Sequence, residues 1–250
     1  MRKLLLLTIG FIFITPAHAD MLGVRLSGGM FKYSLSGTVR DNAVSTQVFD
    51  VKNDLGWKDE TKGMGYLYIE HPIPLIPNFR IGTTSLQLGG TNTLTKDVMY
   101  NGTQFNTNDK VTSDLDLSHN EIALYYEVID TGIDLDLGLN FKFFNGKVFI
   151  KDTSGKTATT TLSSTVPMLY GAVTIPIPGT GFKLAGDLTT TSYQNDNITD
   201  YMVRVRYDTD FALGVELGYR SLHIKYEDTG ANEYANLDMK GPYLMATLSF

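Results

Sequence analysis

Apolar and polar residues alternate strictly along several stretches of the chain. One stretch places Ile133, Leu135, Leu137, Leu139, Phe141 and Phe143 in alternation with Asp134, Asp136, Gly138, Asn140 and Lys142. Another places Phe211, Leu213, Val215, Leu217 and Tyr219 in alternation with Ala212, Gly214, Glu216, Gly218 and Arg220. Because successive side chains of a β-strand point to opposite faces of its sheet, each stretch predicts a strand with one apolar and one polar face. The chain is therefore predicted to be all-β.

The segments between the predicted strands are of two kinds. Short turns are predicted at residues 72–78, 130–132, 176–181 and 208–210, and longer polar loops near residues 38–62, 93–113, 152–160, 194–199 and 228–233. The ten strands that they join are predicted at residues 21–36, 63–72, 78–91, 114–129, 132–151, 161–176, 181–193, 200–208, 211–227 and 234–250. Bacterial outer-membrane barrels have short periplasmic turns and longer extracellular loops. We therefore expect a ten-stranded antiparallel transmembrane β-barrel with both chain ends on the periplasmic side.

The dipeptide Asn145-Gly146 lies inside one predicted strand, although it is typical of hairpin turns. A reversal there would leave only residues 147–152 as a strand, which is shorter than the roughly nine to eleven residues that a membrane-spanning strand needs. The sequence therefore predicts a β-bulge at Asn145-Gly146, with the strand continuing to a loop around Ser154-Gly155.

A soluble sandwich or a lipocalin-like barrel would show the same alternation with its apolar face turned inward. The start of the chain favours the membrane barrel. Arg2-Lys3 precedes the apolar run 4–14, and Ala17-His18-Ala19 supplies a small-residue cleavage site. We expect residues 1–19 to be a secretory signal peptide that is cleaved after Ala19. Residues 20–250 are then expected to form one barrel domain in the outer membrane of a Gram-negative cell.

The last ten residues form another alternating stretch, in which Leu244, Ala246, Leu248 and Phe250 alternate with Tyr243, Met245, Thr247 and Ser249. This ending resembles the C-terminal insertion signal of bacterial outer-membrane barrels, in which the closing strand ends in Phe and presents alternate apolar side chains to lipid. The resemblance implies that Phe250 takes part in assembly. It also implies outer-membrane lipid, the barrel-assembly machinery and periplasmic chaperones as partners.

Charge and residue types exclude several function classes. Among the 250 residues, 27 Asp and Glu outnumber 21 Lys and Arg, and the net charge of −6 argues against nucleic acid as a partner. The chain has no cysteine, so it can form neither a disulfide nor a thiolate site. The sequence shows no nucleotide-binding fingerprint and no metal-ligand spacing, and we expect no cofactor.

The mature chain as a whole resembles a family of small bacterial outer-membrane β-barrel proteins to which no activity is assigned. The shared features are the turn His71-Pro-Ile-Pro-Leu-Ile-Pro-Asn78, the strand Leu135-Asp-Leu-Gly-Leu-Asn140, the segment Pro167-Met-Leu-Tyr170, the turn Ile177-Pro-Gly-Thr-Gly181 and the terminal Phe250. These motifs are architectural. The resemblance therefore implies a fold and a location without implying a substrate.

Three residues are candidates for catalysis. The omptin proteases are also ten-stranded outer-membrane barrels, with an Asp-x-Asp pair facing an Asp-x-His pair across the outer mouth to activate a water molecule. Asp114 and Asp116 match the first pair in type, and His223 matches half of the second, although Ser221 stands where that pair needs Asp. By strand count the two pairs lie on opposite sides of the barrel, which leaves an omptin-like surface protease as the third hypothesis.

The polar faces of the predicted strands carry charges of both signs at close spacing. A lumen charge network is predicted from Asp134, Asp136, Lys142, Arg204, Arg206, Glu216 and Arg220. Side chains just fill the lumen of an eight-stranded barrel, and a ten-stranded one is only slightly wider. Opposite charges packed there should pair and close it. A closed barrel with a structural or surface-interaction role is therefore the first hypothesis, and a narrow porin-like channel for small solutes is the second. The sequence does not predict what the extracellular loops bind.

Overall fold

The computed structural model describes residues 22–40, 48–73, 75–228 and 233–250, which fold into β-strands joined by turns and loops. The wall strands are β1 (Gly23–Arg40), β3 (Glu60–Glu70), β4 (Asn78–Thr84), β9 (His119–Asp130), β10 (Asp134–Asp152), β11 (Thr157–Pro176), β12 (Phe182–Tyr193), β13 (Asp196–Asp208), β14 (Leu213–Asp228) and β15 (Glu233–Ser249). Shorter strands are β2 (Phe49–Asp50), β5 (Gln87–Thr93), β6 (Val98–Tyr100), β7 (Thr103–Phe105) and β8 (Lys110–Asp116). The described part of the chain has no helix long and apolar enough to cross a membrane. The predicted signal peptide, residues 1–19, lies outside the described residues, so its cleavage stays a prediction.

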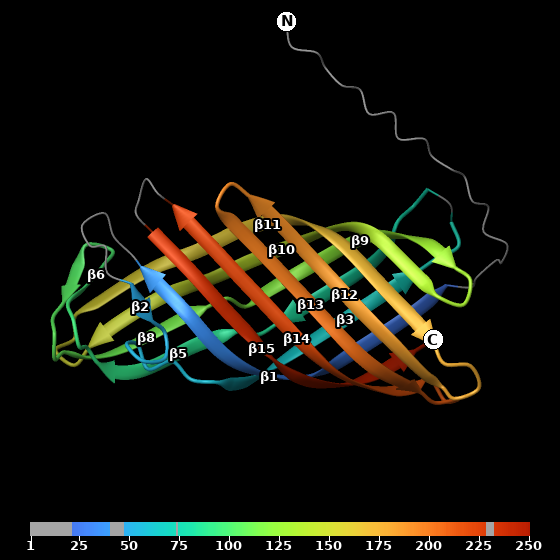
Figure 1. Cartoon of the computed structure of the whole chain (residues 1–250), viewed down its shortest axis with the longest axis horizontal. Helices are drawn as coiled ribbons and strands as arrows, with labels where there is room; N and C mark the ends of the chain where they lie inside the picture. The colour runs from blue at the N-terminus through green and yellow to red at the C-terminus, as the bar shows by residue number, and fades with distance from the viewer. Residues whose placement is uncertain (1–21, 41–47, 74, 229–232) are drawn as a thin grey trace, which may run out of the picture.

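Backbone hydrogen bonds join the wall strands into a closed antiparallel ring (Figure 1). The order around the ring is β1, β3, β4, β9, β10, β11, β12, β13, β14 and β15, and β15 pairs again with β1. The seam between β1 and β15 runs from Arg25 opposite Ser249 to Arg40 opposite Tyr234. The predictions of an all-β fold and of a ten-stranded antiparallel barrel are confirmed.

The two ends of the barrel differ, and we name them by what they hold. The terminal end holds the start of β1, the end of β15 and the turns that follow β3, β9, β11 and β13. The loop end holds β2, β6 and β7 together with the hairpin of β5 and β8, and it lies at the left of Figure 1.

Two of the predicted longer loops are short turns in the structure. Only residues 153–156 separate β10 from β11, and only residues 194–195 separate β12 from β13. The first turn is closed by a hydrogen bond from the Asp152 N–H to the Lys156 carbonyl oxygen (3.0 Å). The sequence pattern did not predict that the strands extend this far, because their extensions carry few apolar residues. Backbone hydrogen bonding between strands does not depend on side-chain polarity.

The other predicted loops contain strands or fall partly outside the described residues. Those at 38–62 and 93–113 include β2 and most of β6 to β8, respectively. β5 and β8 pair with each other, and β8 also pairs with the loop-end half of β10, so the wall continues past β4 and β9 as an extension. The predicted loop at 228–233 includes residues 229–232, which the structure does not describe.

β10 runs without a register shift through Asn145-Gly146, so the predicted bulge is wrong. Gly146 lies where the neighbour of β10 changes from β9 to β8. A Cβ atom at this position would lie 1.9 Å from the carbonyl oxygen of Asp116. The glycine therefore serves a close backbone approach, and the register shift of β10 lies elsewhere, between Leu135 and Asp136.

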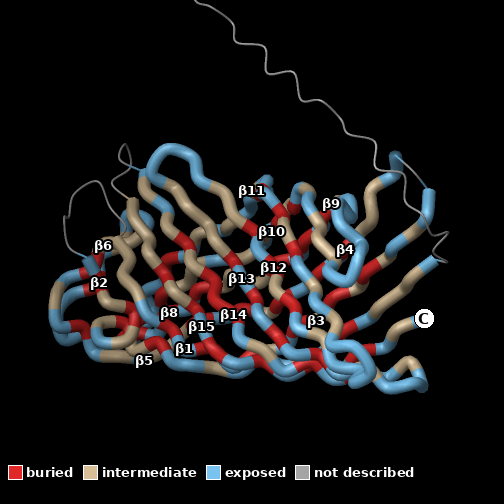
Figure 2. The backbone as a smooth tube through the Cα atoms, turned by 45° about the vertical axis from the view of Figure 1, so that its right-hand side comes forward, coloured by how far each residue is buried: buried red, intermediate tan, exposed pale blue. Residues whose placement is uncertain are grey.

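The apolar face of the wall points outward. Leu169, Leu217 and Leu244 are exposed by 64%, 61% and 56%, whereas Lys142 and Arg220 are fully buried inside the barrel. Figure 2 shows buried and exposed residues alternating along the strands. A soluble sandwich or lipocalin-like barrel would have the reverse arrangement, with its apolar face inside. The structure therefore has the arrangement of a membrane barrel.

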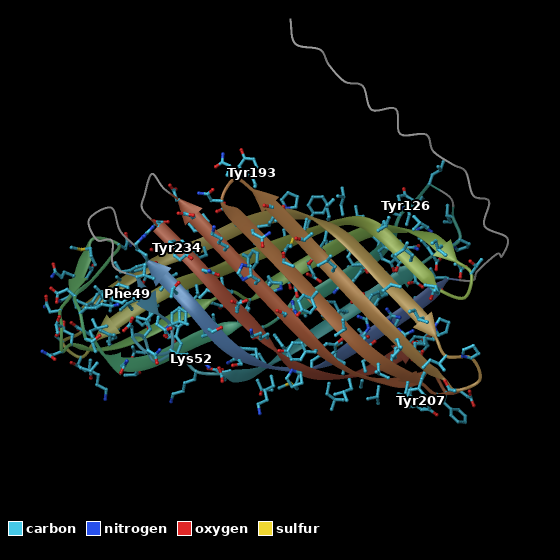
Figure 3. All side chains as sticks on the ribbon, viewed as in Figure 1. Phe49, Lys52, Tyr126, Tyr193, Tyr207 and Tyr234 are labelled. Carbon is cyan, nitrogen blue, oxygen red and sulfur yellow. The ribbon has the colours of Figure 1, made fainter. Side chains whose placement is uncertain are left out.

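Exposed aromatic side chains project from the outer surface of the wall near both ends. Tyr126 and Tyr207 lie toward the terminal end, and Tyr193 lies at the turn after β12 (Figure 3). Phe182 packs against Tyr207 with ring centroids 4.8 Å apart. Aromatic residues in these places are typical of the interfacial girdles that flank the apolar band of outer-membrane barrels.

Candidate functional site

The middle of the barrel interior is filled by a network of buried charges centred on Lys142 of β10. Its Nζ donates to Glu121 Oε2 (2.7 Å), Asp200 Oδ2 (2.9 Å) and His119 Nε2 (3.2 Å), which come from β9 and β13. On the far side, the Arg220 guanidinium of β14 makes two hydrogen bonds to the Asp200 carboxylate, at 2.9 and 2.7 Å. Bidentate pairing of this kind is the strongest form of charge-assisted hydrogen bond. The network links strands from opposite parts of the ring.

His119 belongs to this network as a neutral acceptor. Its Nδ1 lies 2.9 Å from the Leu117 carbonyl oxygen, which can only accept, so the proton of the ring is on Nδ1. Nε2 is then the acceptor for the Lys142 ammonium. Both ring nitrogens have partners and the side chain is buried, so His119 is in no position to act as a base on a substrate at the loop end.

The same cluster offers the ligand types of a metal site, yet a cation already occupies it. Ligand atoms of His119, Glu121 and Asp200 lie within 4.8 Å of one another. The Lys142 ammonium hydrogen-bonds to all three. The arrangement therefore stabilises the folded barrel through an internal cation.

A second group of ion pairs lies nearer the terminal end. The Arg204 guanidinium binds Asp187 through both of its terminal nitrogens, and its Nε lies 3.6 Å from Glu216 Oε2. Arg206 Nε binds Asp208 Oδ2 at 3.1 Å. Apart from Asp208, whose side chain is partly exposed, these charges are buried, so each would be costly without its partner.

Arg80 of β4 lies beside both groups, because it lines a small void together with Glu121, Asp187 and Asp200. Its Nη2 lies 3.1 Å from Glu121 Oε1, and its guanidinium packs over the Tyr66 ring at 4.4 Å from the centroid. A positive guanidinium over an aromatic face is attracted by the negative charge of the ring face. The ion pairs therefore extend as one layer across the interior.

Toward the loop end the buried side chains are apolar instead of charged. Among the most completely buried members of this apolar cluster are Tyr33, Leu35, Leu86, Leu88 and Leu222. These residues come from β1, β5, β14 and the segment between β4 and β5, and they pack together in the interior.

The segment before β3 lies over this cluster and is fixed by specific bonds. Trp57 Nε1 donates to Ser113 Oγ at 2.7 Å, and the Leu35 N–H donates to Asp59 Oδ1 at 2.9 Å. Lys52 Nζ lies 2.7 Å from Asp59 Oδ1. The hydrogen bond from Lys52, followed by the one from the Leu35 N–H, lowers the pKa of the Asp59 carboxyl below its usual value. We call this segment, residues 48–59, the cap.

The three catalytic candidates lie on two strands, β8 and β14. Asp114 and Asp116 lie on β8, and Asp116 Oδ1 accepts a hydrogen bond from the Ser118 N–H (2.9 Å). His223 lies on β14, and its Nδ1 is 3.1 Å from Asp238 Oδ1. In the described ranges no hydrogen bond or ion pair joins either aspartate to His223. The strands that carry them stand on different sides of the ring.

The predicted assembly residues all lie on the outer face of β15 or just after it. Leu244, Ala246, Leu248 and Phe250 are exposed, whereas Tyr243, Met245 and Thr247 between them are buried. The Phe250 N–H donates to the Val24 carbonyl (2.8 Å), and the Val24 N–H donates to the Phe250 carbonyl (3.0 Å). The last residue therefore extends the seam that closes the barrel.

The seven predicted lumen charges occupy two different settings. Lys142, Arg204, Arg206, Glu216 and Arg220 are buried in the ion-paired layer. Asp134 and Asp136 instead line a cavity at the terminal end. The predicted network left out Asp200, which accepts from both Lys142 and Arg220. Its signal was present in the sequence, because Asp200 shares the period-2 phase of Arg204 and Arg206.

Comparison with known proteins relates the chain to one class through its fold. Neither a protein-family model nor a curated protein matches the sequence. Among solved structures, the outer membrane protease OmpT from Escherichia coli superposes with a TM-score of 0.52 at 11% identity, covering 96% of this chain and 99% of that one. The transport unit of the Escherichia coli autotransporter AIDA-I gives a TM-score of 0.38 at 12% identity, with coverage of 96% and 94%.

The fold is therefore that of a bacterial outer-membrane β-barrel. The likeness to OmpT extends over nearly the whole of both chains, and at 11% identity it shows the fold alone. The reaction named for that protein does not carry over to this chain.

Proposed function

We propose that this protein is an integral outer-membrane β-barrel with a closed interior and a structural or surface-interaction role. The outward apolar face and the outer aromatic residues support a position in outer-membrane lipid. The exposed alternate residues Leu244, Ala246 and Leu248 of β15, with Phe250 paired to Val24, support assembly by the barrel-assembly machinery, with periplasmic chaperones as partners during export. In this position the loop end, with its cap, faces outside.

The observation that carries the proposal is the stacking of two filled layers along the barrel axis. The charged layer has Lys142 and Arg220 at its centre, each fully buried and each bound to Asp200. Members of the apolar cluster such as Tyr33, Leu35, Leu86 and Leu88 lie beyond it toward the loop end. An ion would have to break paired charges and then cross a dehydrated apolar region, and both steps are costly.

Conductance in a planar bilayer tests the closed interior. We expect the refolded protein to give no regular single-channel steps at neutral pH. The double variant Arg204→Gln and Arg206→Gln leaves Asp187 and Glu216 without their cations, and we expect it to lower stability and to produce an irregular leak. Lys32→Gln together with Lys240→Gln is the matched control, because both lysines are exposed on the outer face.

Large and regular steps from the unmodified protein would contradict the closed interior and favour the narrow channel. The protease hypothesis has its own readout in the same preparation. Cleavage of unstructured peptides that is abolished by Asp116→Asn or by His223→Ala would overturn the proposed role. We expect no cleavage, since these side chains are not joined and the loop end is filled.

A further inference from the structure

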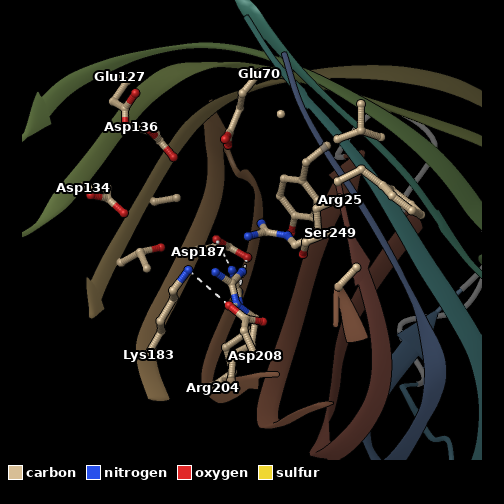
Figure 4. A pocket seen from close by; sticks show the side chains of 18 of the residues that line it. Arg25, Glu70, Glu127, Asp134, Asp136, Lys183, Asp187, Arg204, Asp208 and Ser249 are labelled. Carbon is tan, nitrogen blue, oxygen red and sulfur yellow. Dashed lines mark hydrogen bonds and ion pairs between the residues drawn. The ribbon is translucent and has the colours of Figure 1, made fainter. Parts of the chain in front are cut away.

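A cavity of about 270 Å³ lies inside the barrel at the terminal end. Residues at the strand ends, including Gly23 and Ser249, form its rim. Asp187 and Arg204 close it toward the middle of the barrel, where they belong to the ion-paired layer (Figure 4). The cavity is therefore open toward one end only.

One wall of the cavity is acidic. Glu70 of β3, Glu127 of β9, and Asp134 and Asp136 of β10 line it. Asp136 lies in the repulsive field of Glu70, Glu127 and Asp134. Of the ion pairs formed by the described residues, none includes Asp134 or Asp136. Figure 4 shows Glu127, Asp134 and Asp136 gathered on one side of the cavity.

The opposite wall is basic. Arg25, Lys183, Arg204 and Arg206 line it, from β1, β12 and β13. Lys183 is bound to Asp208 at 3.1 Å, and Arg204 is bound to Asp187. Arg25 and Arg204 lie across the cavity from the acidic group in Figure 4, and Lys183 lies between that group and Asp208.

Three guanidinium groups on the basic wall, those of Arg25, Arg204 and Arg206, each have one nitrogen without a hydrogen-bond acceptor. Arg25 stacks on the Tyr68 ring at 3.8 Å from the centroid, and its Nε has no hydrogen-bond acceptor. Arg206 is only 4% exposed, and its Nη1 also lacks an acceptor, the Glu216 carboxylate being 4.0 Å away. Buried donors are normally satisfied. These nitrogens are themselves buried, so a ligand in the cavity would meet the positive charge of the guanidinium groups, which the neighbouring protein groups do not fully satisfy.

We propose that this cavity binds a small zwitterion that carries an ammonium group and a carboxylate. The ammonium group lies against Glu70 and Asp136, where it relieves the repulsion between carboxylates. The carboxylate of the ligand lies against Arg25 and Arg206, whose planar guanidinium groups match carboxylate geometry. This site is independent of whether the barrel conducts, because its ligand enters and leaves at the terminal end.

The volume restricts the ligand to a small solute. Pockets for drug-sized ligands measure about 300–1,000 Å³. A cavity of about 270 Å³ therefore suits an amino acid or a short unbranched ω-amino acid. A simple cation would leave the guanidinium groups of the basic wall without a carboxylate. A simple anion would leave the carboxylates of the acidic wall repelling one another.

Calorimetric titration of the purified full-length barrel in detergent tests the proposal. The probes are glycine, 4-aminobutanoate and 6-aminohexanoate, each compared with the amine and the carboxylate of the same length, and Ca²⁺. We expect the best zwitterion to bind at least tenfold more tightly than its singly charged analogues and than Ca²⁺. Equal binding by an amine, a carboxylate or Ca²⁺, or no binding by any zwitterion, would overturn the proposal.

Three variants locate the site. Asp136→Asn and Arg206→Gln should each weaken zwitterion binding at least tenfold. Ala172→Leu leaves every charge in place and should abolish binding by filling the cavity, because Ala172 is one of its buried lining residues. If a charge variant fails to fold, Ala172→Leu still tests whether the zwitterion binds in this cavity. Asp114→Asn, an exposed carboxylate on β8, is the control, and unchanged binding in Ala172→Leu would place the ligand elsewhere.

Discussion

At the scale of single residues, Lys142 holds the interior together. Its ammonium group bridges Glu121, Asp200 and His119, and it has no exposed surface. Removing one partner of a buried ion pair leaves an uncompensated charge in a place that water does not reach. Substitution of Lys142 is therefore expected to destabilise the folded barrel.

We predict that Lys142→Met lowers the free energy of unfolding by about 3–5 kcal/mol, because Glu121 and Asp200 lose their shared cation. The urea midpoint of the refolded barrel in detergent measures the effect. Lys240→Met is the matched control, since that exposed lysine lies on the outer face, and it should change the midpoint little. A loss no larger than that of the control would show that the buried network contributes little to stability.

At the scale of the secondary-structure element, β15 closes the ring. It pairs with β14 on one side and with β1 on the other, and Phe250 adds two backbone hydrogen bonds to Val24 beyond the last strand residue. Its inward residues Tyr243 and Met245 are buried, and its outward residues are exposed. β15 therefore contributes to the seam, to the buried interior and to the outer apolar face.

We predict that deletion of Phe250 strongly reduces the amount of membrane-integrated barrel without reducing synthesis. The deletion removes the two bonds to Val24 and the exposed terminal aromatic ring. Heat-modifiable mobility of the membrane-fraction protein on gels measures assembly. Phe211→Ala is the control, because Phe211 is also an exposed aromatic residue at the terminal end, and full assembly of the deleted chain would contradict a role in closure.

At the scale of the whole molecule, the interior changes character along the barrel axis. A cavity with one acidic and one basic wall lies at the terminal end, an ion-paired layer lies in the middle, and an apolar cluster under the cap lies at the loop end. The outer surface keeps its exposed apolar side chains and aromatic residues. This asymmetry gives the two ends different chemistry and therefore different expected surroundings.

We predict that the loop end faces the outside of the cell and the terminal end faces the periplasm. An epitope inserted after Ser154, in the turn between β10 and β11, should be labelled by antibody on intact cells. The matched insertion after Thr131, in the turn between β9 and β10, should be labelled only after the outer membrane is permeabilised. Both turns are exposed, so the reverse result would invert the orientation.

The sequence alone determined the all-β fold, the number of wall strands and which residues share one face of a strand. It could do so because a strand repeats every two residues, so alternation at positions such as Leu135, Leu137 and Leu139 is a purely local signal. Whether that face pointed to lipid or to a core was decided by the closed ring, in which Leu137 and Leu139 are exposed and Asn140 and Lys142 are buried.

Partners far apart in the chain were decided only by the tertiary structure. Lys142 and Asp200 are 58 positions apart, and nothing in a local pattern indicates that one ammonium group bridges them. Gly146 looked like a turn or bulge residue because only the three-dimensional path brings the Asp116 carbonyl against it. The split of the lumen charges has the same cause, because the ring of strands sets which carboxylates meet a cation and which, like Asp136, face a cavity.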